Sequence, residues 1–260
     1  MQVECQRPSW RLRWKEPHMT LNEAGNLSRY LDERYISANS DWHQDDSAWK
    51  FAHISNILDR NSIRPASLCE IGCGAGGIVE LMARHLPDAT VDGFEISPHA
   101  FAICQQRQAP NLTYTQGSPF DGGRHYDVSM AIDVIEHVED PFAFARSMGR
   151  ISTHQVLHIP LDMNALAVAR GWVIEDARNH IGHLHYFTKA TALSLLDECG
   201  LEVVDHFYTP WAIDQAGKTL KKRLAAFPRK VAFGLAPDAI VRLVGGWSLM
   251  VLTRTRSAPS

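Results

Sequence analysis

The stretch Ser67-Leu-Cys-Glu-Ile-Gly-Cys-Gly-Ala-Gly-Gly77 decides the fold of this chain. Its first five residues are mostly apolar and predict a short buried strand. Glycines follow at positions 72, 74, 76 and 77, and apolar residues then recur at helical spacing as far as Leu86. The pattern therefore predicts a strand, a tight glycine turn and a helix, so that backbone N–H groups and a helix N-terminus can approach a ligand closely.

Glu70 distinguishes between two cofactors that such a turn could bind. The spacing Gly72-x-Gly74-x-x-Gly77 fits the dinucleotide fingerprint, whose ligand presents a pyrophosphate to the turn. A carboxylate at position 70 would repel that dianion and would suit a ligand with a cationic end. The segment EIGCGAG, residues 70–76, resembles motif I of the class I S-adenosylmethionine (SAM) methyltransferases, whose ligand carries a sulfonium and an ammonium. This resemblance favours a methyl donor over a nicotinamide cofactor.

The rest of the chain predicts an α/β fold. Further strands are expected at residues 89–96, 112–116, 126–132, 154–160, 201–207 and 247–253. A helix from Pro98 to Gln108 is expected to start behind Ser97, and a helix from Lys189 to Cys199 to end at Gly200. Five strands with helical crossovers and a closing pair make a doubly wound, mostly parallel, seven-stranded sheet. This is the Rossmann-like methyltransferase fold that the resemblance implies.

We expect three divisions along the chain. Residues 1–60 form an N-terminal helical segment, with helices expected at 27–35 and from Asp46 or Ser47 onwards. Residues 61–254 form the SAM-binding domain, and residues 255–260 a short tail. Two insertions, 161–187 and 209–246, are expected over the C-terminal edge of the sheet.

Composition excludes several classes of protein. The chain has 260 residues, 45% of them apolar, which is enough for a substantial core. A formal charge of −3 gives no reason to expect a nucleic-acid partner, and no apolar run reaches the roughly 20 residues of a membrane span. The five cysteines read as reduced, and the N-terminus shows no secretory pattern, so we expect a cytoplasmic protein.

An acid at the end of the second strand supports a nucleoside ligand. Glu95 lies 18 residues beyond Gly77, where a carboxylate can accept hydrogen bonds from ribose hydroxyls. Many methyltransferases carry a further acid after the third strand for the adenine amine, whereas this chain offers Ser118, and Asp121 three residues later. The residues expected to bind the cofactor are Glu70, Gly72, Cys73, Gly74, Gly76, Glu95, Ile96, Ser118 and Asp133.

The segment Asp133-Val-Ile-Glu-His-Val138 follows the fourth strand. It resembles the corresponding loop of ubiquinone-synthesis-type methyltransferases, in which Asp133 would form the floor near the sulfur. Asp133 and His137 are four residues apart and would share one side of a helical turn at the ligand-binding edge. Several such enzymes bind a divalent metal through an acid–acid–His set, here Asp133, Glu136 and His137. We rank a pocket wall above that metal site and expect no metal.

The first insertion ends in a cluster of histidines, Asn179-His-Ile-Gly-His-Leu-His-Tyr186. Histidine suits proton removal near neutral pH. The candidate general bases are His137 first, then His180 or His183. A zinc site is disfavoured, because no cysteine or carboxylate nearby has matching ligand spacing.

The second insertion is basic and contains apolar residues at intervals. We expect a helical lid with a solvated basic face, in preference to an interfacial helix on anionic lipid. Its lysines could also attract an acidic or phosphorylated substrate.

We therefore expect methyl transfer from SAM to a small-molecule acceptor, and most simply to a hydroxyl oxygen with a histidine as general base. Two alternatives stay open. One is an NAD-dependent oxidoreductase, and the other is a non-catalytic SAM-binding protein associated with membranes. No integral membrane segment is expected, and peripheral membrane contact is compatible with the basic insertion.

Overall fold

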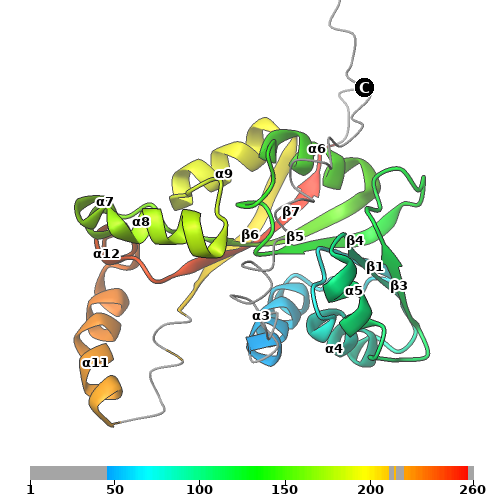
Figure 1. Ribbon diagram of the computed structural model, residues 1–260, viewed down its shortest axis with the longest axis horizontal. Helices are drawn as coiled ribbons and strands as arrows, with labels where there is room; N and C mark the ends of the chain where they lie inside the picture. Colours follow the sequence, from blue (N-terminus) through cyan, green and yellow to red (C-terminus); the bar gives the residue numbers. More distant parts are fainter. Residues whose placement is uncertain (1–45, 211–213, 215–219, 257–260) are drawn as a thin grey trace, which may run out of the picture.

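A seven-stranded sheet forms the centre of the computed structural model, which describes residues 46–210, 214 and 220–256 (Figure 1). The strand order is β3-β2-β1-β4-β5-β7-β6. Strands β1 to β5 are mutually parallel, and β7 runs antiparallel to both β5 and β6. The doubly wound, mostly parallel sheet is confirmed. Its strands are β1 Ser67–Ile71, β2 Thr90–Glu95, β3 Leu112–Gln116, β4 Tyr126–Ile132, β5 Ser152–Pro160, β6 Leu201–Thr209 and β7 Ser248–Thr255.

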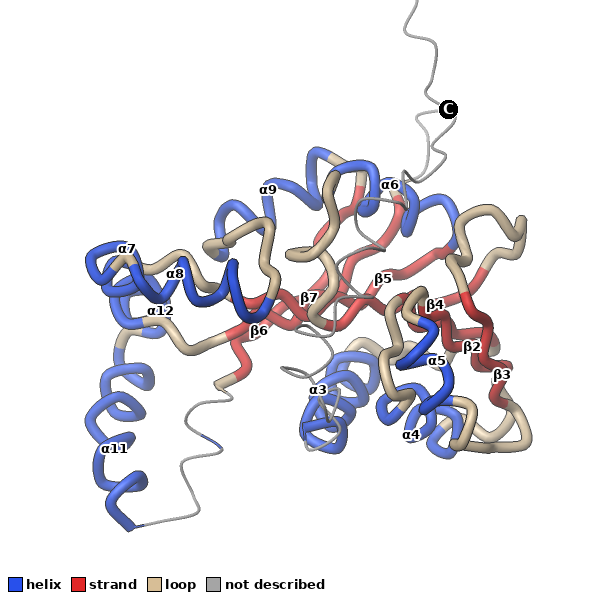
Figure 2. The backbone as a smooth tube through the Cα atoms, viewed as in Figure 1, coloured by secondary structure: helices blue, strands red, loops and turns tan. Residues whose placement is uncertain are grey.

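Helices cover both faces of the sheet and give it two cores (Figure 2). Figure 2 shows one group of helices below the sheet and another above it. Successive residues of β4 alternate between the two cores, with Ala131 in one and Met130 and Ile132 in the other, as expected of a strand buried on both faces. The helices below are α3 Ser47–Arg60, α4 Gly77–His85 and α5 Pro98–Cys104, and those above are α6 Pro141–Ile151 and α9 Lys189–Glu198.

Helix α5 is shorter than the sequence predicts. The Ser97 hydroxyl caps its start, accepting from the Ala100 amide, but the helix ends at Cys104 and not at Gln108. Arg107 leaves the helical path because its guanidinium donates to the Ala75 carbonyl at 2.7 Å and also pairs with Glu80. Of the two N-terminal helices expected, the one at 27–35 lies outside the described residues.

The two insertions pack together at one end of the molecule. The first contains α7 Ala165–Arg170, α8 Trp172–Asp176 and a π-helical turn, Ala177–Ile181; the second contains α11 Leu220–Leu235 and α12 Pro237–Val244. Helix α12 packs against both α7 and α11 (Figure 1). None of the described helices combines the length and apolar character that crossing a bilayer requires.

Strand order reverses between β1 and β4, which are neighbours although two strands separate them in sequence. In open parallel sheets, ligands bind outside the carboxyl ends of the strands at such a reversal. The glycine turn after β1 and the acidic loop after β4 both lie there. The fold therefore places the two sequence motifs side by side.

Candidate active site

The glycine turn adopts a backbone that only glycine accommodates without strain. Gly72, Gly74 and Gly76 have φ angles of 71°, 55° and 78°. A Cβ at Gly72 would lie 2.9 Å from a methyl of Val134, and one at Gly76 would lie 2.6 Å from the Tyr114 hydroxyl. At Gly72 and Gly76, a side chain would be disfavoured both by the left-handed backbone and by a steric clash.

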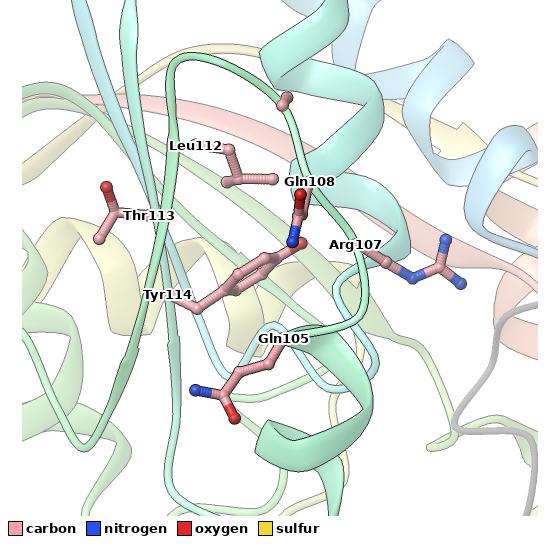
Figure 3. Close-up of a pocket in the computed structure, with 7 residues that line it drawn as sticks. Gln105, Arg107, Gln108, Leu112, Thr113 and Tyr114 are labelled. Atoms are coloured by element: carbon pink, nitrogen blue, oxygen red, sulfur yellow. The ribbon is translucent and has the colours of Figure 1, made fainter.

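A shallow cavity of about 390 Å³ lies behind this turn, between α5 and β3 (Figure 3). Two polar side chains that line the cavity donate hydrogen bonds to backbone carbonyls of the glycine turn. Arg107 donates to the Ala75 carbonyl, and the Tyr114 hydroxyl donates to the Gly76 carbonyl at 3.3 Å. The cavity lies beside the N-terminal half of β3, away from the carboxyl ends of the strands, so we read it as support for the turn.

Glu70, the penultimate residue of β1, has a buried carboxyl group whose hydrogen-bonding capacity is not fully used. It is 1% exposed, and among the described residues its Oε2 has no hydrogen-bond partner. Burial raises the pKa of Glu70 to about 8, and the positive charge of Lys50 only partly offsets that effect. A cationic group placed beside this carboxyl would stabilise its ionised form. The position suits the ammonium end of a ligand.

Glu95 links the glycine turn to the start of α5. Its Oε2 accepts from the Gly74 amide at 2.8 Å and its Oε1 from the Ser97 amide at 2.7 Å. Burial raises the pKa of Glu95, and these backbone donors act in the opposite direction. Each carboxylate oxygen has a second acceptor site, so Glu95 retains capacity for ribose hydroxyls.

The other expected cofactor residues lie around the same edge. Cys73 is buried within the glycine turn, and Ile96 is half-buried after β2. The Ser118 hydroxyl accepts from the Phe120 amide at 3.3 Å.

Asp133 lies at the centre of a buried ionic network that the sequence did not indicate. Its Oδ2 is 2.8 Å from the Lys50 ammonium of α3, and its Oδ1 is 2.6 Å from Nδ1 of His158 on β5. Nε2 of His158 lies 2.8 Å from the Thr209 hydroxyl. Burial opposes ionisation of Asp133, but His158 and Lys50 outweigh it and lower the pKa of this carboxyl. The network fixes an anion just after β4, the strand that pairs with the β1 strand of Glu70.

The expected helical turn through Asp133 and His137 is wrong. Asp133 has a left-handed backbone with φ 55°, and a single turn, closed by the His137 amide bonding to the Val134 carbonyl, follows it. The two side chains therefore diverge: Asp133 contacts Lys50 and His158, whereas His137 contacts the first insertion. Three or four residues of regular helix would have been needed to align them.

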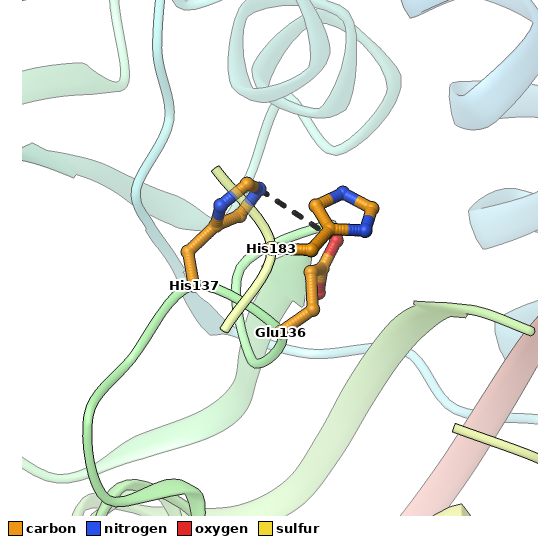
Figure 4. A group of neighbouring side chains, drawn as sticks. All are labelled: Glu136, His137 and His183. Atoms are coloured by element: carbon orange, nitrogen blue, oxygen red, sulfur yellow. Dashed lines mark ion pairs between the residues drawn. The ribbon is translucent and has the colours of Figure 1, made fainter. Parts of the chain in front are cut away.

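His137 instead meets His183 and Glu136, as Figure 4 shows. The two imidazole rings pack edge to face with centroids 4.9 Å apart, and Nε2 of His137 is 3.9 Å from Oε1 of Glu136. The backbone amides of Leu184 and His185 both donate to the Glu136 carbonyl, which ties the insertion to this loop. Two of the three candidate bases thus come together from segments far apart in sequence.

His183 is held by a carboxylate, and His180 lies elsewhere. Nδ1 of the buried His183 is 2.6 Å from Oδ2 of Asp162, the second residue after β5. An ionised carboxylate can only accept, so the hydrogen is on Nδ1 and the lone pair on Nε2. The exposed His180 pairs with Asp176 one turn earlier on the same helical segment. The structure therefore does not bring His180 to the other two histidines.

Comparison with known proteins identifies the family. A family model described as a methyltransferase domain matches residues 42–206, which include both motifs. The chain belongs to the SAM-dependent methyltransferases. Because the chain belongs to this family, the alternative of an NAD-dependent oxidoreductase is excluded, in agreement with the presence of Glu70 before the glycine turn.

Curated relatives of this methyltransferase act on different acceptors. It is 31% identical over 102 residues to a ubiquinone biosynthesis O-methyltransferase of Azorhizobium caulinodans, covering 36% of this chain and 40% of that protein. It is 28% identical over 153 residues to the enzyme of that name in Methylobacterium nodulans, covering 54% and 61%. It is also 30% identical over 116 residues to a norajmaline N-methyltransferase of Rauvolfia serpentina, covering 41% and 38%. The matches thus span less than two thirds of these relatives.

Solved structures share the fold at low sequence identity. The N-methyltransferase NodS of Bradyrhizobium japonicum, in complex with S-adenosylhomocysteine, superposes with a TM-score of 0.56 at 17% identity, over 87% of this chain and all of that one. The magnesium protoporphyrin IX methyltransferase of Synechocystis, with the same product bound, gives 0.53 at 16% identity, over 82% and 83%. At these identities the likeness concerns the fold alone.

The residues around Glu136 fit a divalent cation. One ligand atom each of Glu136, His137 and His183 lies within 4.8 Å of the others. Glu136 is fully buried, and in the described part of the chain neither of its carboxyl oxygens has a hydrogen-bond partner. This set differs from Asp133, Glu136 and His137, the metal site ranked second from the sequence, because Asp133 is engaged by Lys50 and His158. Ligand spacing within the first insertion did not indicate the group, because its carboxylate comes from the loop after β4.

Proposed function

We propose that this methyltransferase moves the methyl group of SAM to a hydroxyl oxygen of a small molecule, with His183 as the general base. The observation that carries the proposal is the 2.6 Å contact between His183 Nδ1 and Asp162, which leaves Nε2 to accept a proton, on a side chain that clusters with Glu136 and His137. A protonated hydroxyl needs such a base to become nucleophilic, whereas a neutral amine does not.

The reaction is an in-line displacement at a carbon already activated by its sulfonium leaving group. The enzyme's main contribution is to hold the acceptor oxygen roughly 3 Å from that carbon and in line with the C–S bond. In our proposal Glu70, with the amides of Gly72 and Gly74, receives the methionine end, and Glu95 receives the ribose. Cys73, Gly76, Ile96 and Ser118 complete the cofactor site.

Asp133 and Lys50 have complementary roles in this scheme. The Asp133 carboxylate, ionised by its contacts with Lys50 and His158, follows β4 and would form the floor near the sulfur. The Lys50 ammonium is close enough to Glu70 to lower that carboxyl's pKa, and it can pair with the methionine carboxylate. A cation and two acids would thus match a zwitterionic, positively charged ligand.

His183 takes the proton in preference to the other two histidines. Asp162 fixes its tautomer and stabilises the imidazolium that forms, which is the role of the acid in a Ser-His-Asp triad. His137 lines the same wall with its Nδ1 3.2 Å from the Gly182 carbonyl. His180 is exposed and paired with Asp176 outside the cluster.

Glu136, His137 and His183 would be the residues that hold a divalent cation. Such an ion would supply a Lewis acid that lowers the pKa of a hydroxyl bound to it. The proposal does not need it. Burial, followed by the negative charge of Asp133, raises the pKa of Glu136 well above its usual range, and this favours the protonated carboxyl when no cation is bound.

The acceptor in this proposal is a small hydroxylated molecule, of the kind that the ubiquinone-biosynthesis relatives act on. Alanine variants of the three histidines test the assignment of the base. At saturating SAM and acceptor, His183→Ala is expected to lose most of its turnover and His180→Ala to keep it. Near-normal turnover of His183→Ala would remove His183 from the mechanism.

A further inference from the structure

The exposed apolar side chains of this protein gather on its two insertions. Nine of the eleven large apolar residues that are exposed in the described part of the chain lie there. The other two, Phe142 and Val204, lie on helix α6 and strand β6. We call the nine the insertion surface: Met163, Val168, Trp172, Ile181, Phe227, Val231, Leu235, Leu243 and Val244.

Helix α11 has an exposed apolar face in addition to the face that packs against the rest of the protein. Its inner face is anchored by Phe233, which stacks on Trp247 with ring centroids 5.1 Å apart. Phe227, Val231 and Leu235 follow one another at intervals of four residues, so they share a different face, and they are 65%, 46% and 83% exposed. Isolated exposed apolar residues are ordinary, but a stripe of them marks an interaction site.

The elements that carry the insertion surface are contiguous. Helix α12, which carries Leu243 and Val244, packs against α11 on one side and against α7, which carries Val168, on the other. Helix α7 in turn packs against α8, which carries Trp172. Figure 2 shows these four helices together at one end of the molecule. The apolar residues therefore belong to one end, not to scattered sites.

Basic residues are concentrated in the sequence of the second insertion, and its described helices α11 and α12 carry Arg229, Lys230 and Arg242 at this end. Residues 209–246 contain seven basic and two acidic residues, a net charge of +5 in a chain whose total is −3, so the rest of the chain carries −8. One of the two acids, Asp238, is already paired with Lys189. The basic residues are Lys218, Lys221, Lys222, Arg223, Arg229, Lys230 and Arg242.

We propose that the insertion surface docks on a lipid bilayer with anionic headgroups. Apolar side chains on short helices, flanked by lysine and arginine, have the composition of a peripheral interfacial anchor, and each basic residue adds electrostatic attraction to an anionic surface. A second copy of the chain is a poorer occupant, because a symmetric contact through the second insertion would bring together two segments that each have a net charge of +5 in sequence.

Docking would also orient the candidate active site. Ile181 belongs to the insertion surface and lies two residues before His183. An acceptor dissolved in the bilayer would then reach the site from the membrane side. This last step rests on the proposed function, whereas the docking itself does not.

Flotation of the full-length protein with vesicles tests the docking. One set of vesicles is phosphatidylcholine alone, and the other also contains phosphatidylglycerol. The protein is expected to float with the anionic vesicles and to be released by high salt. Phe227→Ser/Leu235→Ser, which leaves the charge unchanged, and Lys230→Glu/Arg242→Glu are each expected to weaken binding at least about tenfold.

Matched controls keep the test decisive. Val204→Ser removes an exposed apolar residue from β6, and Arg64→Glu/Arg254→Glu makes the same charge change elsewhere. Both are expected to bind like the parent protein, and SAM titration verifies that every variant is folded. The proposal is overturned if the parent protein does not float, or if the control variants lose as much binding as the test variants. It is also overturned if light scattering shows a dimer that Phe227→Ser/Leu235→Ser dissociates.

Discussion

Nδ1 of His183 lies 2.6 Å from the Asp162 carboxylate, so the end of β5 and the end of the first insertion meet in one acid–imidazole pair. The contact places the hydrogen of a neutral His183 ring on Nδ1, and the His183 side chain lies in the cluster with Glu136 and His137. The pair joins residues 21 positions apart, across two short helices.

Asp162→Asn is expected to lower kcat by about 10- to 100-fold and to leave the Kd for SAM unchanged, because the amide stabilises the wrong tautomer and no longer stabilises the imidazolium. Steady-state kinetics and SAM titration measure the two quantities. Asp176→Asn, which alters the His180 pair, serves as the control and should keep full turnover. A parallel loss of SAM affinity in Asp162→Asn would show a structural role instead.

SAM binding is expected to release close to one proton at pH 7. Free Glu70 has a pKa of about 8 and is mostly protonated at that pH, whereas the ligand's ammonium would hold it ionised. Because the complex binds fewer protons than the free protein, the affinity for SAM should rise with pH and level off above about pH 8. Calorimetric titration in buffers of different ionisation enthalpy counts the proton. Glu70→Gln should release no proton when it binds SAM. An unchanged release in that variant would show that the proton comes from a group other than Glu70.

Lys50→Met is expected to reduce the free energy of unfolding by about 3–5 kcal/mol, because it removes the buried ammonium that pairs with both Asp46 and Asp133. Urea unfolding measures the change. Arg60→Met provides the comparison, since the half-exposed Arg60–Asp205 pair should contribute about 1 kcal/mol or less. Equal effects of the two variants would mean that the Lys50 network carries little stability.

A chelator is expected to leave turnover unchanged, because in the proposal His183 removes the proton without a metal, and burial raises the pKa of Glu136 and so opposes a carboxylate there. Turnover before and after treatment with EDTA, with the metal content of the protein measured alongside, checks this. Loss of activity that manganese or zinc restores would assign Glu136, His137 and His183 to a cation. His183 could then no longer be the base.

Local pattern predicted the fold well because each element carries its own signal. Strands β1, β3 and β4 begin and end where their apolar runs do, and Ser97 and Gly200 mark helix ends by local hydrogen bonding and backbone conformation. The end of α5 was missed because its cause, the Arg107 contact with Ala75, joins residues 32 positions apart.

The candidate site was only partly predictable for the same reason. Glu70 and Glu95 follow from motifs that are contiguous or regularly spaced. Lys50 and His158 reach Asp133 from α3 and β5, and no pattern in either segment marks them. His183 was among three histidine candidates, but its partners Asp162 and Glu136 became visible only when the insertion was folded onto the loop after β4.

The most direct test of the account follows the methyl group itself. The protein is incubated with SAM labelled with ¹³C in the methyl group and with a pool of small hydroxylated molecules from a cell extract, and the labelled products are identified by NMR and mass spectrometry. The account predicts a ¹³C methyl ether that forms with the parent protein and with His180→Ala but not with His183→Ala. Label on nitrogen, or no labelled product from any acceptor, would contradict it.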